Sequence, residues 1–150
     1  MTKKIFLIVI SFLILSSCGY EPIYSKKNLN FSIGNIEKTN TSLNNQFTRV
    51  INSLNNKKTD DKINIKIESK KEIFIKSKNA KGDPLVFEVE IILEVLIIDQ
   101  NKENKRTFSR KITYNNSDDK FKLKQYEKEL EKILIVKIVE DLISYVSNVR

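Results

Sequence analysis

Histidine and cysteine, two side chains that often catalyse reactions or bind metals, are nearly missing from this chain. It has no histidine, which removes the usual general base near neutral pH and the commonest zinc ligand. Its one cysteine, Cys18, can form neither an internal disulfide nor a thiolate metal cluster. Gly19, Gly34 and Gly82 are isolated from one another, so no glycine-rich loop could hold a phosphate. We therefore expect no enzymatic activity, no metal and no cofactor.

Acidic side chains offer the remaining route to catalysis. Glu88, Glu90 and Glu94 share one face of a predicted strand, where a pair of carboxylates could hydrolyse a glycosidic bond. A solvated strand face explains the same spacing without any chemistry. A hydrolase that uses Glu88 or Glu90 is therefore the weakest hypothesis for this chain.

Lysines gather in another predicted strand and in the turn that follows it. Grouped ammonium ions could bind the phosphates or acidic sugars of a glycolipid. Lysines on a solvated edge strand also discourage aggregation, and this ordinary role is the alternative. The predicted ligand-binding residues are Lys76, Lys78 and Lys81, with Lys66, Lys70 and Lys71 as further members. A second basic group has a weaker claim and comprises Lys102, Lys105, Arg106, Arg110 and Lys111.

The composition agrees with an anionic partner. The chain has 27 Lys and Arg against 19 Asp and Glu, a formal net charge of +8. A basic surface suits nucleic acid, anionic lipid headgroups or an acidic glycolipid. The bias towards Lys, Asn and Ile can also reflect the base composition of a genome, so the charge alone does not choose among these partners.

The amino terminus has the layout of a secretory signal. Lys3 and Lys4 precede an apolar run over residues 5–15, which is shorter than the roughly 20 residues that a membrane-spanning helix needs. The ending Leu15-Ser16-Ser17-Cys18 resembles the lipobox, after which a cysteine is acylated and becomes the first residue. We expect a signal peptide over residues 1–17, a permanent membrane anchor at Cys18 and a tether over residues 18–29. Export makes nucleic acid an unsuitable partner.

Periodicity then divides residues 30–150 into elements of a single domain. A short strand over residues 30–36 contains a bulge or bend at Gly34, and a helix follows over residues 41–56, with Thr41 or Ser42 as its N-cap. Alternating isoleucines predict a strand over residues 62–77, in which Ser69 and Lys71 point inward or mark a bulge. After a turn at residues 79–84, alternation resumes over residues 85–98.

Two further elements complete the domain. Residues 99–105 are polar and predict a connection to a strand in which Phe108, Ile112 and Tyr114 share one phase. A helix of about thirty residues follows Ser117-Asp118-Asp119. Its predicted apolar stripe consists of Phe121, Leu123, Tyr126, Leu130, Ile133, Leu134, Ile138, Leu142, Tyr145, Val146 and Val149. The order β-α-β-β-β-α predicts an α+β two-layer sandwich, in which two amphipathic helices cover one face of a four-stranded, mostly antiparallel sheet.

The residues that begin at the predicted lipid-bearing cysteine resemble a known family. The segment Cys18-Gly19-Tyr20-Glu21-Pro22-Ile23-Tyr24 is similar to the opening of LptE-type LPS-assembly lipoproteins, especially alphaproteobacterial forms. The predicted order of elements also agrees with that family's fold. Gly19, in place of an aspartate after the cysteine, implies sorting to the outer membrane in bacteria that use the familiar sorting system.

The resemblance implies a function without catalysis. Proteins of this family sit inside the LptD outer-membrane β-barrel as a plug, assist its assembly and help deliver lipopolysaccharide to the outer leaflet. The expected partners are thus an LptD-type barrel and lipopolysaccharide, in a one-to-one complex with the barrel. The alternative that the residues leave open is a structural or scaffolding lipoprotein of another envelope complex.

Overall fold

The structure is a computed structural model that describes residues 31–55, 61–100 and 102–149. Cys18, the signal peptide and the tether lie outside the described residues. Six elements follow one another: β1 (Ser32–Lys38), α2 (Ser42–Leu54), β2 (Lys62–Lys78), β3 (Pro84–Asp99), β4 (Lys102–Asn115) and α3 (Lys120–Val149). This order is the one that the sequence predicts.

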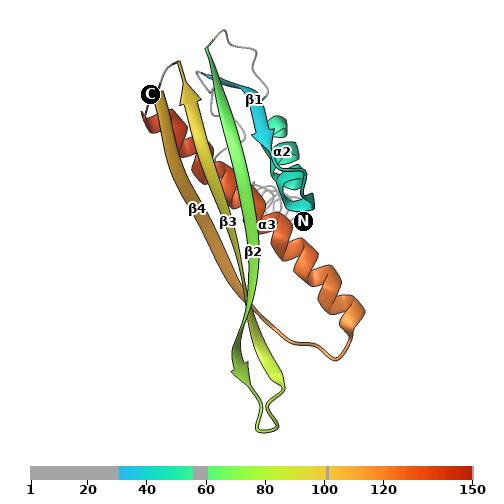
Figure 1. The fold of residues 1–150 in the computed structure, drawn as a ribbon. Helices are drawn as coiled ribbons and strands as arrows, with labels where there is room; N and C mark the ends of the chain where they lie inside the picture. The colour runs from blue at the N-terminus through green and yellow to red at the C-terminus, as the bar shows by residue number, and fades with distance from the viewer. Residues whose placement is uncertain (1–30, 56–60, 101, 150) are drawn as a thin grey trace, which may run out of the picture.

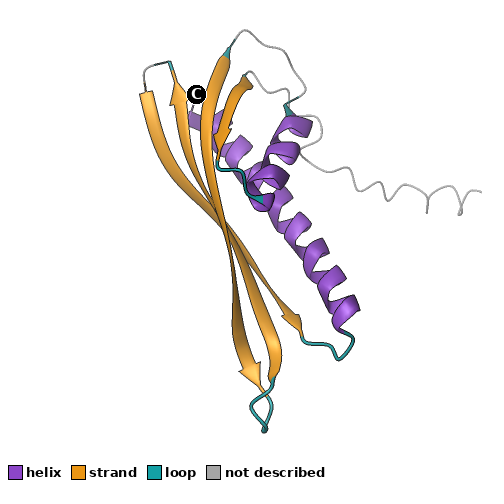
Figure 2. Cartoon of the chain, turned by 45° about the vertical axis from the view of Figure 1, so that its right-hand side comes forward, coloured by secondary structure: helices purple, strands orange, loops and turns teal. Residues whose placement is uncertain are grey.

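The strands form one mixed sheet in the order β1-β2-β3-β4, with β1 parallel to β2 and the other pairs antiparallel. Both helices pack on the same face of the sheet, and the other face carries no helix (Figures 1 and 2). The predicted two-layer α+β sandwich is therefore confirmed. We call the covered side the helix face and the other side the open face.

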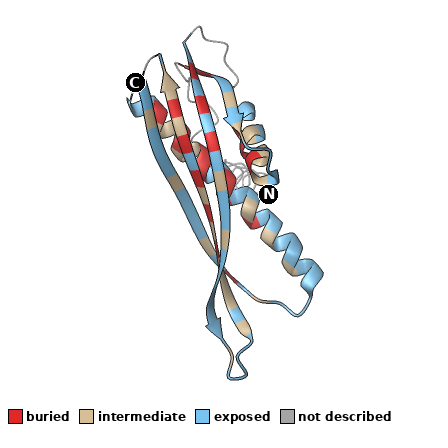
Figure 3. Cartoon of the chain, viewed as in Figure 1, coloured by how far each residue is buried: buried red, intermediate tan, exposed pale blue. Residues whose placement is uncertain are grey.

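Alternation along β2 and β3 places the core between the two layers. Ile63, Ile65 and Ile67 of β2 are almost fully buried, as are the odd-numbered residues 89–97 of β3. Phe47 and Ile51 of α2 close the core from the helix layer. Burial concentrates in one half of the molecule, whereas β2 beyond Ser69 is mostly exposed and the start of β3 is mostly half-buried (Figure 3).

The predicted irregularity of the first strand is confirmed as a β-bulge. The register between β1 and β2 shifts between Ile33 and Ile36. A Cβ atom on Gly34 would lie 3.1 Å from Oδ1 of Asn64, and the backbone N–H of Asn35 donates to that same oxygen at 2.9 Å. Glycine thus permits a close approach to the neighbouring strand.

Helix α2 begins where the sequence predicts. Thr41 is its N-cap, and the Thr41 hydroxyl accepts a hydrogen bond from the backbone N–H of Asn44 at 3.1 Å. Asn44 is itself buried, and its Oδ1 accepts from the hydroxyl of Ser69 at 2.5 Å. Of the two predicted alternatives for Ser69, pointing inward or marking a bulge, the first is therefore correct.

Helix α3 begins as predicted, but its apolar stripe was only partly correct. Oδ1 of Asp119 accepts from the backbone N–H of Lys122 at 3.0 Å and caps the helix. Helix α3 contacts α2 as well as the sheet, so its buried residues cover a wider arc than one stripe. Three buried residues were therefore missed: Ile135, Val139 and Ile143. Four stripe residues are exposed instead: Phe121, Tyr126, Ile133 and Val149.

The predicted connection over residues 99–105 was wrong. β4 begins at Lys102, which pairs with Asp99, and Gln100 makes the turn with a positive φ of 54°. The polar residues that follow belong to an edge strand. Asn104 donates to the hydroxyl of Tyr145 at 2.9 Å, so polarity here reflects side chains that reach helix α3.

Candidate functional site

The six predicted ligand-binding lysines do not form one patch. Lys66 and Lys70 lie on the open face, because they alternate with inward-pointing residues of β2. Lys71 lies on the helix face, where its Nζ is 2.7 Å from Oε2 of Glu131. Along an extended strand Lys66 and Lys78 are about 40 Å apart. The six lysines are therefore close in sequence but too far apart in space to form one binding site.

Three of the predicted lysines do lie near one another, at the end of the β2–β3 hairpin. Lys76 occupies an irregularity in the pairing with β3, and its Nζ is 3.5 Å from Oε1 of Glu88. Lys78 ends β2, and Lys81 lies in the turn beside Gly82, whose φ of 89° suits glycine. Within the described residues, Lys78 and Lys81 form no ion pair. The hairpin end is thus a basic projection, and it extends away from α2 (Figure 1).

Large apolar side chains, which are not part of the predicted site, accompany these lysines. Ile73, Phe74, Ile75 and Leu85 are each between 43% and 49% exposed. Exposed apolar groups next to lysines form an amphipathic surface, which suits ligands that combine anionic and apolar parts. The available signal was that the helix over residues 41–56 is too short to cover a strand that reaches residue 77.

The acidic side chains of β3 lie on the open face. Glu88 contacts Lys76, and Oε2 of Glu94 is 2.7 Å from Nζ of Lys105. The hydrogen bond to Glu94, together with its charge, raises the pKa of Lys105. These contacts engage two of the three carboxylates in separate ion pairs across the open face.

The second basic group fixes α3 to the edge of the sheet. Arg110 donates from Nε and Nη2 to the two carboxylate oxygens of Asp141, both at 2.8 Å. The hydrogen bonds and the charge of Asp141 raise the pKa of Arg110. Arg106 donates from Nε to the hydroxyl of Tyr145 at 2.7 Å, and its guanidinium lies 4.9 Å from the centre of that ring. These two arginines therefore have a structural role.

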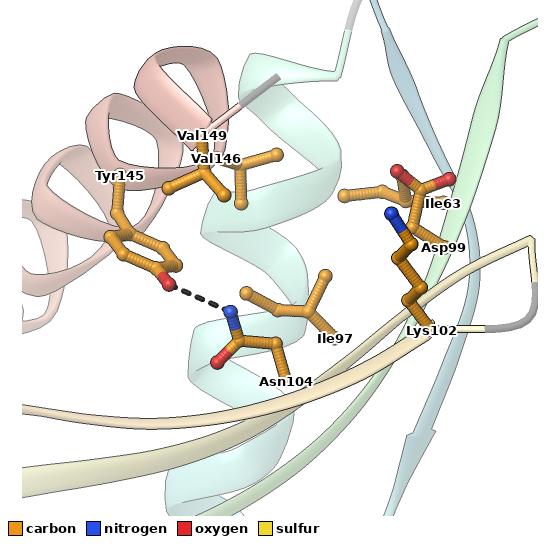
Figure 4. Close-up of a pocket in the computed structure, with 8 residues that line it drawn as sticks. All are labelled: Ile63, Ile97, Asp99, Lys102, Asn104, Tyr145, Val146 and Val149. Carbon is orange, nitrogen blue, oxygen red and sulfur yellow. Dashed lines mark hydrogen bonds between the residues drawn. The ribbon is translucent and has the colours of Figure 1, made fainter.

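A pocket of about 360 Å³ opens at the end of the sandwich opposite the hairpin (Figure 4). Its apolar wall is made by Ile63, Ile97, Val146 and Val149. Its polar rim is made by Asp99, Lys102, Asn104 and Tyr145. Asn104 and Tyr145, two of these four polar side chains, are hydrogen-bonded to each other.

No group of three or more carboxylate or thiol side chains within the described residues could hold a metal ion. Among the helices described, none is long and apolar enough to cross a bilayer.

No protein-family model and no curated protein matches the chain. Several solved structures do match the chain. Rare lipoprotein B from Shewanella oneidensis has a TM-score of 0.59 at 13% identity, over 77% of this chain and 96% of that one. A minor lipoprotein from Acinetobacter baumannii gives 0.58 at 15% identity, over 80% and 92%. Lipoprotein B from Nitrosomonas europaea gives 0.57 at 19% identity, over 81% and 88%. The chain therefore shares the fold of these bacterial lipoprotein structures.

Proposed function

We propose that this chain is an outer-membrane lipoprotein that plugs an LptD-type β-barrel, assists its assembly and helps deliver lipopolysaccharide to the outer leaflet. One combination of observations supports the proposal most strongly. The segment from Cys18 to Tyr24 resembles LptE-type proteins, and the domain behind it has the fold of rare lipoprotein B. The proposal assigns no catalytic step to the chain.

The open face of the sheet suits a plug. It presents charged side chains from three strands, including Lys66, Lys70, Glu94 and Lys105. The lumen of an outer-membrane barrel is polar, in contrast to its lipid-facing exterior. A layer with a charged outer face and a buried apolar inner face could therefore sit in such a lumen without exposing its core.

The basic hairpin end supports the part of the proposal that concerns lipopolysaccharide. Lys78 and Lys81 have no ion-pair partner among the described residues, so their charges are available to phosphates of an anionic glycolipid. We predict that Lys76→Glu, Lys78→Glu and Lys81→Glu together weaken lipopolysaccharide binding about tenfold or more, because attraction becomes repulsion. Binding is measured with purified protein, and circular dichroism checks that the domain stays folded.

The matched control for this triple variant places the same charge change elsewhere. Lys111, Lys122 and Lys137 are exposed residues of β4 and α3, and their replacement by glutamate should leave binding within about twofold. Equal losses of lipopolysaccharide binding in both triple variants would mean that the overall charge of the protein, and not the position of the hairpin lysines, governs binding. Unchanged binding in the first variant would assign its lysines to solubility.

Co-purification tests the barrel partnership. The lipidated chain, carrying an affinity tag at its carboxyl terminus, is recovered from outer-membrane extracts in a detergent that preserves the barrel. The proposal expects an LptD-type barrel among the recovered proteins. Recovery of a different envelope complex, with the barrel left in the unbound fraction, would instead favour the scaffolding alternative.

A further inference from the structure

Helix α2 is too short to cover the whole helix face of β2. Its 13 residues extend about 20 Å, whereas the 17 residues of β2 extend about 55 Å. The hydrogen bond between Asn44, in the first turn of α2, and Ser69 marks where this cover ends. The residues of β2 beyond Ser69 continue on the helix face without α2 above them.

The uncovered part of β2 keeps the apolar pattern of the core but not its burial. Lys71, Ile73 and Ile75 continue the phase of Ile65 and Ile67. The two latter isoleucines are 1% exposed, whereas Ile73 and Ile75 are 48% and 49% exposed. Two isoleucines of the helix face thus remain open to solvent.

Helix α3 does not close this gap, because its first half packs towards β4. Tyr114 of β4 is buried, and its ring packs edge-on against Tyr126 of α3 with centroids 6.3 Å apart. On the side towards β3, Tyr114 stacks on Phe87 at 5.5 Å. The aromatic contacts therefore cover the β4 side of the hairpin and leave the β2 side open.

A basic cleft of about 300 Å³ adjoins this open strip and lies between α2, β2 and α3. Its lysines are Lys71, Lys124, Lys128 and Lys132. Its two carboxylates have internal partners. Glu131 accepts from Gln46 at 2.6 Å and from Lys71 at 2.7 Å, and Glu127 accepts from the hydroxyl of Tyr114 at 2.7 Å.

The charges of this cleft are therefore unbalanced. Within the described residues, Lys124, Lys128 and Lys132 form no ion pair and line one concave surface. Lys71 lies at the border, two residues from Ile73 and so about 7 Å away along the strand. A basic cleft thus passes directly into an exposed apolar strip.

We infer that this surface, here called the cleft-and-strip site, binds one phosphorylated lipid molecule. The lysines of the cleft hold its phosphate, and an acyl chain lies along Ile73 and Ile75 towards Leu85. Strand geometry makes the path from Lys71 to Ile75 about 13 Å, which is the scale of a medium acyl chain. The inference deepens the proposed function and rests on it only for the identity of the natural lipid.

The test uses residues 18–150 with Cys18→Ser and measures binding of monomeric dodecyl phosphate by calorimetry. Lys124→Glu with Lys128→Glu, and Ile73→Ser with Ile75→Ser, should each weaken binding about tenfold, because one pair removes the attraction and the other the apolar contact. Lys124→Gln with Lys128→Gln is the milder variant, with an expected loss of about threefold. Circular dichroism confirms that each variant is folded.

Both controls match the test variants in exposure. Lys111→Glu with Lys137→Glu makes the same charge change on β4 and α3, at exposed lysines that form no ion pair among the described residues, and should alter binding less than about twofold. Ile133 and Val136 of α3 are 47% and 40% exposed, and their replacement by serine should be equally mild. Equal losses in controls and test variants would overturn the inference.

Three probes separate the lipid from its parts. Inorganic phosphate binding as tightly as dodecyl phosphate would reduce the site to an anion site, and equal binding of dodecyl maltoside would reduce it to an apolar surface. Binding to phosphatidylglycerol vesicles without binding of the monomer would assign the surface to a bilayer. Each result overturns the inference. Failure to recover a barrel would overturn the proposed function while leaving dodecyl phosphate binding intact, so the two failures can be told apart.

Discussion

Asn44 joins the first turn of α2 to β2, at the point where the cover of β2 by α2 stops. Its replacement tests how much this contact contributes to the free energy of unfolding. The side chain is 1% exposed. Its Nδ2 donates to the carbonyl of Thr39 at 2.9 Å, and its Oδ1 accepts from Ser69 at 2.5 Å. Asn44→Ala removes both hydrogen bonds. At about 1 kcal/mol for each bond, the free energy of unfolding should fall by about 2 kcal/mol.

The two hydrogen-bond partners of Asn44 are accessible to water, which limits the fall in the free energy of unfolding. Thr39 is exposed and Ser69 is half-buried, so water can replace part of what Asn44 provides. Urea denaturation of residues 18–150 with Cys18→Ser measures the loss. Asn52 lies on the exposed side of the same helix, and Asn52→Ala is the matched control, with an expected change below about 0.5 kcal/mol.

A double-mutant cycle with Ser69→Ala isolates the contact between α2 and β2. The coupling between Asn44 and Ser69 should be about 1 kcal/mol, because one hydrogen bond joins them directly. A coupling near zero, or an Asn44→Ala variant no less stable than Asn52→Ala, would refute the claim that this contact holds the first turn of α2 on β2.

Two further predictions concern a buried tyrosine and the membrane anchor. Burial, and then the hydrogen bond to Glu127, raise the pKa of Tyr114 above 10.0, so the folded state holds this proton more tightly than the unfolded chain. The stability that this proton contributes is complete below about pH 10 and is lost at higher pH. The free energy of unfolding, measured by denaturation at about pH 9 and again at about pH 11, should therefore fall less for Tyr114→Phe than for the parent chain. Cys18→Ser should abolish incorporation of labelled palmitate, because the thiol of Cys18 is the predicted site of acylation; palmitate incorporated into the variant would contradict the assignment of Cys18.

The fold was predictable because alternation and helical spacing state which residues share a face. Ile63, Ile65 and Ile67 predicted both a strand and its buried side, and Asp119 predicted the start of α3. Alternation does not state what covers that side. Ile73 and Ile75 share the phase of these buried isoleucines and yet are exposed, because the first turn of α2 lies over Ser69 and the helix covers nothing beyond it.

The candidate site was less predictable than the fold because it depends on which elements meet. Lys66 and Lys71 are close in sequence but lie on opposite faces of β2. Lys124 and Lys128 come from α3, far along the chain, and only packing places them beside Lys71. The polar start of β4 looked like a loop, because an edge strand whose side chains reach a helix needs no apolar alternation.

The mass of the complex that forms around the lipidated chain decides whether the chain is the plug of a barrel. The complex is recovered through a tag on this chain, and its mass is measured by native mass spectrometry in detergent. We expect one copy of this chain bound to one LptD-type barrel. A complex that contains the chain but no barrel, or a chain recovered alone under conditions in which the barrel stays folded, would contradict it.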